Sequence, residues 1–242
     1  MNLFEEGNMF HGKMKALTFS YDDGVFQDRR LLKIFNKYGL KGTFNLNSDM
    51  LGSATAFFFK GMTIPRVVPR ASEIAAIYQG HEVAAHTLTH AMLPDLSDED
   101  VIREVENDRR ALSEIVGYDV VGLAYPNGGA NYDQRVIKLL KENTGIRYAR
   151  TLVCTENFDQ QTDDLLEYRP TVYHNCGWDK LFRLAHEFVA LKTVTPKVFY
   201  IWGHSYEFDR GDSWEKMDEL CSILAEKDDI FYGTNREVLL GE

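Results

Sequence analysis

Short apolar runs alternate with longer amphipathic stretches along most of this 242-residue chain. Apolar runs rich in β-branched and aromatic residues are typical of strands, and apolar residues that recur every three or four positions are typical of helices. The apolar runs predict strands at residues 16–21, 43–46, 82–86, 120–124, 146–150, 198–202 and 230–232. The helical periodicity predicts helices at residues 29–38, 72–79, 97–116, 133–142, 180–191 and 213–225, with a short last helix after residue 234.

Capping residues support two of these helices. Ser97 precedes three acidic residues, which is the pattern of an N-cap followed by a first turn that complements the helix dipole. Thr234 and Glu237 have the spacing of a capping box. We therefore expect helices to begin directly after Ser97 and Thr234.

Three segments do not follow the alternation. Residues 48–70 are interrupted by breaks at Gly61, Pro65 and Pro69, and we expect a long irregular functional loop or insertion there. Within it, partial burial of residues 57–59, three phenylalanines, is favoured over stacking on a sugar. The first dozen residues are expected to form an arm before the first strand, and residues 151–176 carry no clear pattern.

The predicted strands lack a clean alternation of apolar and polar positions, which is typical of parallel strands buried on both faces. Seven or eight strand–helix alternations over about 240 residues favour a (β/α) barrel, with some irregularity, over an open doubly wound sheet. No GxGxxG sequence follows the first strand, which disfavours dinucleotide binding. We expect an α/β fold with residues 1–242 in one domain.

Composition narrows the possible partners. The chain is 44% hydrophobic and 26% charged, which fits a globular protein and excludes disordered, collagen-like and coiled-coil classes. The 37 acidic and 27 basic residues leave a formal charge of −10, so nucleic acid and anionic membranes are repelled on average. A neutral small molecule or an uncharged polymer fits better.

Targeting and cysteine patterns predict a cytoplasmic protein. The N-terminal residues show neither the basic nor the apolar region of a signal peptide, and no apolar run reaches the length of a membrane span. The three cysteines are scattered without CxxC spacing, so neither a disulfide framework nor a thiolate zinc site is expected.

Reactive residues recur where predicted strands end. Asp22 and Asp23 follow the first strand, His86 follows the third, Asn127 the fourth, and His204 a late one. In a parallel barrel these ends meet on one face, where active sites lie. We therefore expect these side chains to share one site.

Two histidines and a carboxylate suit a metal. His86 and His90 are four residues apart, so one helical turn or a tight loop would aim both rings at one point. A catalytic zinc site needs three protein ligands and one open position. Adjacent carboxylates at Asp22 and Asp23 repel each other unless a cation offsets them, and a metal on one would let the other act as a base. A histidine at position 204 is suited to protonating a leaving group.

Each signal also has an ordinary structural interpretation. Asp-Asp-Gly is most often a solvated turn. The pair His86 and His90 is equally compatible with two exposed histidines that bind no ligand. His204 is compatible with a packed histidine whose ring bonds to a carbonyl. The convergence of all of them on one face favours the functional interpretation.

The sequence resembles the polysaccharide deacetylase family, which is carbohydrate esterase family four. Residues 18–24, TFSYDDG, resemble its first motif, and residues 86–90, HTLTH, match its H-[ST]-x-x-H motif. Residues 124–128, AYPNG, and residues 201–204, IWGH, resemble its third and last motifs, in the family's order.

The resemblance implies an irregular (β/α) barrel of about seven strands and metal-dependent removal of acetyl groups from N-acetylated sugars, with zinc the favoured divalent metal. Asp23, His86 and His90 would bind the metal, Asp22 would be the general base, His204 the general acid, and the backbone N–H of Asn127 an oxyanion donor, with Tyr125 near the substrate.

Three departures from the family pattern concern neighbouring groups. Ala124 stands where an arginine usually pairs with the catalytic aspartate. Arg150 and Arg169 are candidate replacements, although an ordinary ion pair is the favoured interpretation for each. Asn127 stands where the family often has tyrosine, although Tyr125 is two residues earlier.

The third departure concerns the carboxylate that orients the acid histidine. The family places an aspartate next to a tryptophan for this role, and Trp178-Asp179 has the reverse order. Asp179 is therefore a weak candidate, with Glu207 and Asp209 as rivals. His174 is a further candidate for facing the site.

Two alternatives stay open at this point. One is hydrolysis of another linear or cyclic amide on the same fold. The other is a non-catalytic carbohydrate-binding module, against which the intact set of carboxylates and histidines argues. A measurement of bound metal would distinguish the binding module from an enzyme, because a binding module would not need a metal.

Overall fold

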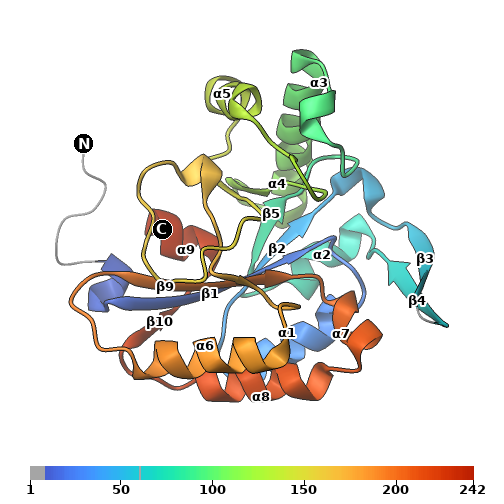
Figure 1. The fold of residues 1–242 in the computed structure, drawn as a ribbon. Coiled ribbons are helices and arrows are strands. Elements are labelled where there is room, and N and C mark those ends of the chain that lie inside the picture. Colours follow the sequence, from blue (N-terminus) through green and yellow to red (C-terminus); the bar gives the residue numbers. More distant parts are fainter. Residues whose placement is uncertain (1–8, 60) are drawn as a thin grey trace.

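The computed structural model describes residues 9–59 and 61–242 (Figure 1). One sheet has the strand order β7-β6-β5-β2-β1-β9-β8, and β10 pairs with β1 outside this path. Every pairing in this sheet is parallel. Its strands are β1 (Lys15–Asp22), β2 (Thr43–Leu46), β5 (Glu82–Ala85), β6 (Gly122–Ala124), β7 (Tyr148–Arg150), β8 (Val172–Tyr173), β9 (Lys197–Gly203) and β10 (Ile230–Tyr232).

Helices connect successive strands. They are α1 (Asp28–Lys37), α2 (Ala71–Ile77), α3 (Asp98–Ile102), α4 (Asp108–Val116), α5 (Gln134–Asn143), α6 (Trp178–Ala190), α7 (Tyr206–Gly211), α8 (Trp214–Leu224) and α9 (Asn235–Leu240). Helices α1, α6 and α8 lie together along one side of the sheet, and α3, α4 and α5 lie on another (Figure 1). The fold is therefore α/β in one domain: seven parallel strands curl into a half-barrel, as the sequence pattern predicts, and β10 pairs with β1 outside this path.

The two edge strands of the half-barrel are joined through one intervening segment. Tyr168 makes a parallel bridge to Arg150 on β7, and its N–H donates to the carbonyl of Ala149. Three residues later, the N–H of Thr171 donates to the carbonyl of Tyr200 on β9. Residues 165–171 thus fill the opening between β7 and β8, which makes the barrel irregular.

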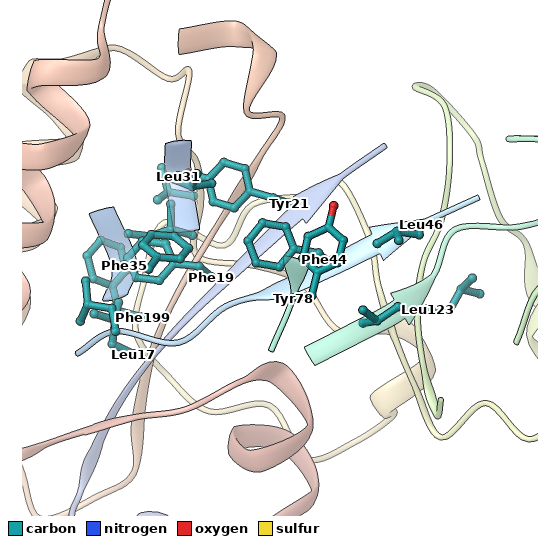
Figure 2. Close-up of a cluster of buried hydrophobic side chains, with 14 of the residues drawn as sticks. Leu17, Phe19, Tyr21, Leu31, Phe35, Phe44, Leu46, Tyr78, Leu123 and Phe199 are labelled. Carbon is teal, nitrogen blue, oxygen red and sulfur yellow. The ribbon is translucent and has the colours of Figure 1, made fainter. Parts of the chain in front are cut away.

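The strands form because both of their faces are covered. All eight residues of β1 are buried, which explains why its sequence shows no alternation. Figure 2 shows the aromatic side chains of Phe19 and Phe44 from neighbouring strands beside Phe35 of α1 and Tyr78, which follows α2. The rings of Phe19 and Phe35 are 4.6 Å apart, and those of Phe44 and Tyr78 are 4.8 Å apart. Burying each such side chain contributes about 1.5–3 kcal/mol to stability.

The expectation of a loop or insertion over residues 48–70 is wrong in one respect, because part of the segment is regular. Strands β3 (Ala54–Phe59) and β4 (Met62–Val67) form an antiparallel hairpin that projects from the body near α2 (Figure 1). Threonine and three consecutive phenylalanines have high strand propensity, which outweighs the single proline on this exposed two-stranded ribbon. Phe58 is 74% exposed, so its expected burial is also wrong. The side chains of residues 57 and 59 lie outside the described residues.

Other boundaries differ by a few residues. The helix expected over 97–116 is interrupted by a π-helical turn, Arg103–Asn107, and α7 was not predicted. The caps are confirmed: Ser97 accepts from the N–H of Asp100, and Thr234 forms a capping box with Glu237. Most of the expected N-terminal arm lies outside the described residues.

Two further expectations concern cysteines and membranes. Within the described residues, all three cysteines are free thiols. No helix there has both the length and the apolar character needed to cross a bilayer.

Candidate active site

A pocket of about 410 Å³ opens at the carboxyl ends of the parallel strands, a size suited to a small-molecule ligand. Its lining residues are Asp22, Asp23, Arg66, His86, His90, Tyr125, Asn127, Gly128, Leu152, Trp202, His204 and Tyr206. Every site residue carried over from the sequence motifs is among them. The parallel topology explains this convergence, because the strands leave all their carboxyl ends on one face.

Asp23, His86 and His90 form a group that could hold a metal ion. One ligand atom from each lies within 4.8 Å of the others. Oδ1 of Asp23 is 3.5 Å from Nε2 of His90 and 4.0 Å from Nε2 of His86. This oxygen is buried and accepts no hydrogen bond. A buried carboxylate oxygen without a donor, facing two imidazole nitrogens, fits the donor set of zinc.

The ring of His86 is held in the tautomer that a metal needs. Its Nδ1 lies 2.8 Å from the carbonyl oxygen of Ala124, which can only accept, so Nδ1 carries the proton. Burial lowers the pKa of His86 to about 4, so the ring is neutral at pH 7. The Nε2 lone pair therefore faces Asp23, an arrangement common for metal-binding histidines.

A tight loop, rather than a helical turn, brings the two histidines together. Thr87 and His90 have left-handed backbone conformations, with φ of 66° and 62°. The loop is tied to the π-helical turn, since Glu104 accepts from the N–H and hydroxyl of Thr89 and its own carbonyl accepts from the N–H of Leu88. π-Helical turns and strained residues often occur at functional sites.

Asp22 lies beside this group and is paired with a buried arginine. Nη2 of Arg150 is 2.6 Å from Oδ2 of Asp22, and Nδ2 of Asn45 donates to Oδ1 at 2.7 Å. Burial alone would raise the pKa of Asp22, but the charges of Arg150, His86 and His204 outweigh it and lower that pKa. Asp22 is therefore ionised at neutral pH.

The favoured interpretation of Arg150 as an ordinary surface or interface ion pair is wrong. Its side chain is fully buried and its guanidinium stacks 4.4 Å from the ring of Trp202. It reaches Asp22 from the end of β7. The arginine that is usual in the family would stand at the end of the preceding strand, β6, where this chain has Ala124. Arg169 is an exposed residue that bonds to Gln161 instead.

His204 stands at the other side of Asp22. Its Nε2 is 4.0 Å from Oδ2 of Asp22, and its Nδ1 is 3.5 Å from Oε2 of Glu207. Burial lowers the pKa of His204, but Glu207 and the two aspartates more than offset this, and the net pKa is raised. The ring is thus disposed to carry a proton next to an ionised base.

Glu207 is the carboxylate that contacts His204. It also lies 3.0 Å from Nε2 of His174 and accepts from Tyr173 and Arg210. His174 is buried behind Glu207 and does not line the pocket. Asp209 instead accepts from Gln27 and Trp214. The weak candidate Asp179 lies on the exposed first turn of α6, outside the pocket.

The loop after β6 forms another wall of the pocket. Asn127 has a φ of 66°, and its side-chain amide donates to the carbonyl of His90 at 2.9 Å. Asn131 donates to three successive carbonyls of this loop, that of Asn127 included. The hydroxyl of Tyr125 donates to the carbonyl of Leu166, so any contact of Tyr125 with a ligand involves its other atoms.

Sequence reasoning missed several residues of the site. Arg66, from the hairpin, lies 2.9 Å from Oδ1 of Asp23, and nothing in its sequence context signals this. Asn45 is the last residue but one of β2 and pairs in register with Asp22 on β1, so its position near a strand end could have pointed to it. The other unforeseen lining residues are Gly128, Leu152, Trp202 and Tyr206.

The profile of the family described as polysaccharide deacetylase matches residues 10–149, more than half of the chain. The chain belongs to the polysaccharide deacetylase family. The matched segment contains Asp22 and the three candidate metal ligands, and it ends one residue before Arg150. No curated protein is similar enough to count as a relative.

Solved structures support the same fold. A polysaccharide deacetylase-like structure from Mycobacterium smegmatis has a TM-score of 0.67 at 18% identity, covering 94% of this chain and 89% of its own. The Xyl-CE4 domain of a multidomain xylanase from the hindgut metagenome of Trinervitermes trinervoides has a TM-score of 0.58 with the same identity and coverage. A CE4 family pseudoenzyme from Bacillus anthracis has a TM-score of 0.55 at 18% identity, covering 97% of this chain and 66% of its own. Members of this fold thus include proteins without activity.

Proposed function

We propose that this protein is a metal-dependent hydrolase that removes the acetyl group from an N-acetylated sugar or a related amide. The observation that carries the proposal is one pocket that holds a candidate metal group, an ionised carboxylate and a histidine with a raised pKa. These are the parts that amide hydrolysis needs: water activation, carbonyl polarisation and protonation of the leaving nitrogen.

Asp23, His86 and His90 would hold the metal, with zinc favoured by the donor set of two imidazoles and one carboxylate. A divalent ion bound there lowers the pKa of water and polarises the amide carbonyl. Asp22, kept ionised by Arg150, takes a proton from the attacking water. The backbone N–H of Asn127 is our candidate donor to the developing oxyanion, because its side-chain amide is already bonded to His90.

His204 acts as the general acid. The carbon–nitrogen bond of the amide breaks as the nitrogen takes the proton from His204, and acetate and a free amine result. An amine that leaves without this proton is a very poor leaving group. Glu207 on the far side of the ring supports the protonated form of His204.

The test combines metal analysis with acetate release. Wild-type protein is incubated with zinc and dialysed, its metal content is measured, and acetate is quantified after incubation with a panel of N-acetylated sugars. Asp22→Asn should retain zinc and lose activity, whereas His86→Ala should lose both. His186→Ala is the matched control, because this exposed histidine on α6 lies outside the pocket.

Bound zinc with acetate release that both site variants abolish would support the proposal. Zinc binding without acetate release from any sugar would direct the search to other linear or cyclic amides. A folded wild-type protein that neither binds metal nor releases acetate would overturn the proposal and favour a carbohydrate-binding module.

A further inference from the structure

The β3–β4 hairpin places one arginine in the pocket on a firmly held backbone. The carbonyl of Pro65 accepts from Nε2 of Gln27 at 3.0 Å, and the carbonyl of Val67 accepts from the N–H of Phe26 at 2.7 Å. These contacts fix the main chain on both sides of Arg66. The long side chain is thereby presented to the pocket.

Arg66 makes its ion pair with a candidate metal ligand. Nη2 of Arg66 is 2.9 Å from Oδ1 of Asp23, which is the oxygen that faces His86 and His90. Despite this short distance, Oδ1 of Asp23 accepts no hydrogen bond, so the contact is an ion pair without hydrogen-bond geometry. Nε of Arg66 is also buried and has no hydrogen-bond acceptor. The guanidinium is therefore held by charge alone, with donors to spare.

A divalent cation on Asp23 would change this arrangement. The ion and the guanidinium would share one carboxylate oxygen of the buried Asp23, and two positive groups this close repel each other strongly away from bulk water. Metal binding would release Arg66 from Asp23 while leaving its backbone in place. The freed guanidinium would then need another anion inside the same pocket.

From these contacts, and resting on the proposed function, we infer that Arg66 binds an anionic group of the substrate, a carboxylate or a phosphate, close to the acetamido group. The planar fork of arginine matches both anions. Arg66 is the only lysine or arginine among the described residues that line the pocket. With a formal charge of −10 on the whole chain, an anionic substrate depends on such a local positive group.

The test is a binding experiment that does not depend on turnover. Zinc-loaded protein is titrated calorimetrically with N-acetylglucosamine, with its 6-phosphate, and with N-acetylmuramic acid, which adds a carboxylate. Wild type is compared with Arg66→Gln and Arg66→Lys. Arg183→Gln is the control, since it removes an exposed arginine outside the pocket.

We expect wild type to bind at least one charged probe tenfold or more tightly than the neutral sugar. Arg66→Gln should lose this preference, Arg66→Lys should keep part of it, and Arg183→Gln should keep all of it. In the absence of sugar, Arg66→Gln should bind zinc more tightly than wild type, because Asp23 no longer has a competing partner.

Two results would overturn the inference. One is a wild type without preference for either charged probe. The other is an Arg66→Gln variant with an unchanged preference, since the anion would then be bound by the metal alone. If the charged probes bind through Arg66 but no acetate is released from any substrate, the proposed hydrolysis fails while the role of Arg66 in anion binding stands.

Discussion

The guanidinium of Arg150 lies 2.6 Å from Oδ2 of Asp22, and neither side chain is more than 2% exposed. The two residues are 128 positions apart and lie on β7 and β1, which other strands separate in the sheet. A buried carboxylate without a partner would bind a proton, so this contact keeps the candidate base of the site ionised.

Replacing Arg150 with methionine should therefore affect both stability and activity. Breaking a buried ion pair by removing one partner costs about 3–5 kcal/mol, because a charge is left alone in the interior. We expect a loss of this size in urea denaturation and a fall in kcat on the order of 10²-fold. Arg150→Lys should recover only part of either loss, since lysine has no planar fork.

The double variant Asp22→Asn with Arg150→Met separates charge from packing. It should be more stable than Arg150→Met alone, because no carboxylate is left buried and unpaired. Equal stability of the two variants would mean that Arg150 acts mainly through its packing on Trp202.

Replacing Glu207 with glutamine should weaken the acid at His204. Without the carboxylate, the pKa of His204 falls, so the alkaline limb of kcat/KM should move to lower pH and kcat should drop about tenfold or more. The measurement is a pH profile of acetate release. Asp179→Asn is the control, and it should leave the profile unchanged, because Asp179 is exposed on α6. An unaltered profile in Glu207→Gln would contradict the assignment of Glu207 as a positioning residue.

Metal binding should raise thermal stability. A ligand present at 100 times its Kd stabilises the folded state by about 2.7 kcal/mol. For a chain of this size that corresponds to a rise in Tm on the order of 5–10 °C. Differential scanning fluorimetry with zinc, and then with excess chelator, should show the rise and its reversal in wild type. His90→Ala should show neither the rise in Tm nor its reversal, whereas His186→Ala should behave as wild type. A rise of the same size in His90→Ala would mean that zinc binds elsewhere.

Asp28 should make stability depend on pH. It is fully buried, it accepts from the hydroxyls of Tyr78 and Ser205, and burial raises its pKa to about 7. An unfolded aspartate titrates near pH 3.9, so between about pH 4 and 7 the folded chain holds a proton that the unfolded chain has lost. The free energy of unfolding therefore falls as pH rises through this window, by up to about 1.4 kcal/mol per pH unit from this one group.

Asp28→Asn removes this contribution. Urea denaturation at pH values from 4 to 8 should show that the stability difference between wild type and Asp28→Asn changes steadily up to about pH 7 and then levels off. The exposed Asp49→Asn serves as the control for removal of a surface carboxylate. A flat difference for Asp28→Asn would mean that Asp28 is ionised throughout.

The sequence predicted the parts of the fold that depend on local pattern. Strands such as Lys197–Gly203 have long enough apolar runs, and helices such as Asn235–Leu240 have caps, so each is encoded within a few residues. The same applies to the pocket residues at strand ends, because parallel topology brings all such ends together. That is why the sequence alone predicts that Asp22, His86 and His204 share one site.

What the sequence did not predict depends on contacts between distant segments. Arg66 lies on a hairpin whose strand pairing is set by its own cross-strand contacts, and its entry into the pocket depends on how Gln27 and Phe26 hold the hairpin. Arg150 ends a strand of only three residues, and burial beside Asp22 follows from strand order rather than from its neighbours in sequence. Glu207 and Asp209 are both on α7, and only the direction of each side chain shows that Glu207, not Asp209, contacts His204.

The order of the site residues along the chain separates the candidate metal ligands and Asp22 from the residues that would supply and support the acid. All three candidate metal ligands lie before residue 91, in the segments that directly follow β1 and β5, whereas Arg150, His204 and Glu207 follow residue 149. Mutations in the later half of the chain can therefore remove proton transfer and leave ion binding intact. Loss of activity in this fold need not entail loss of the metal, and a descendant of such a protein could persist as a metal-dependent binder of the same ligand.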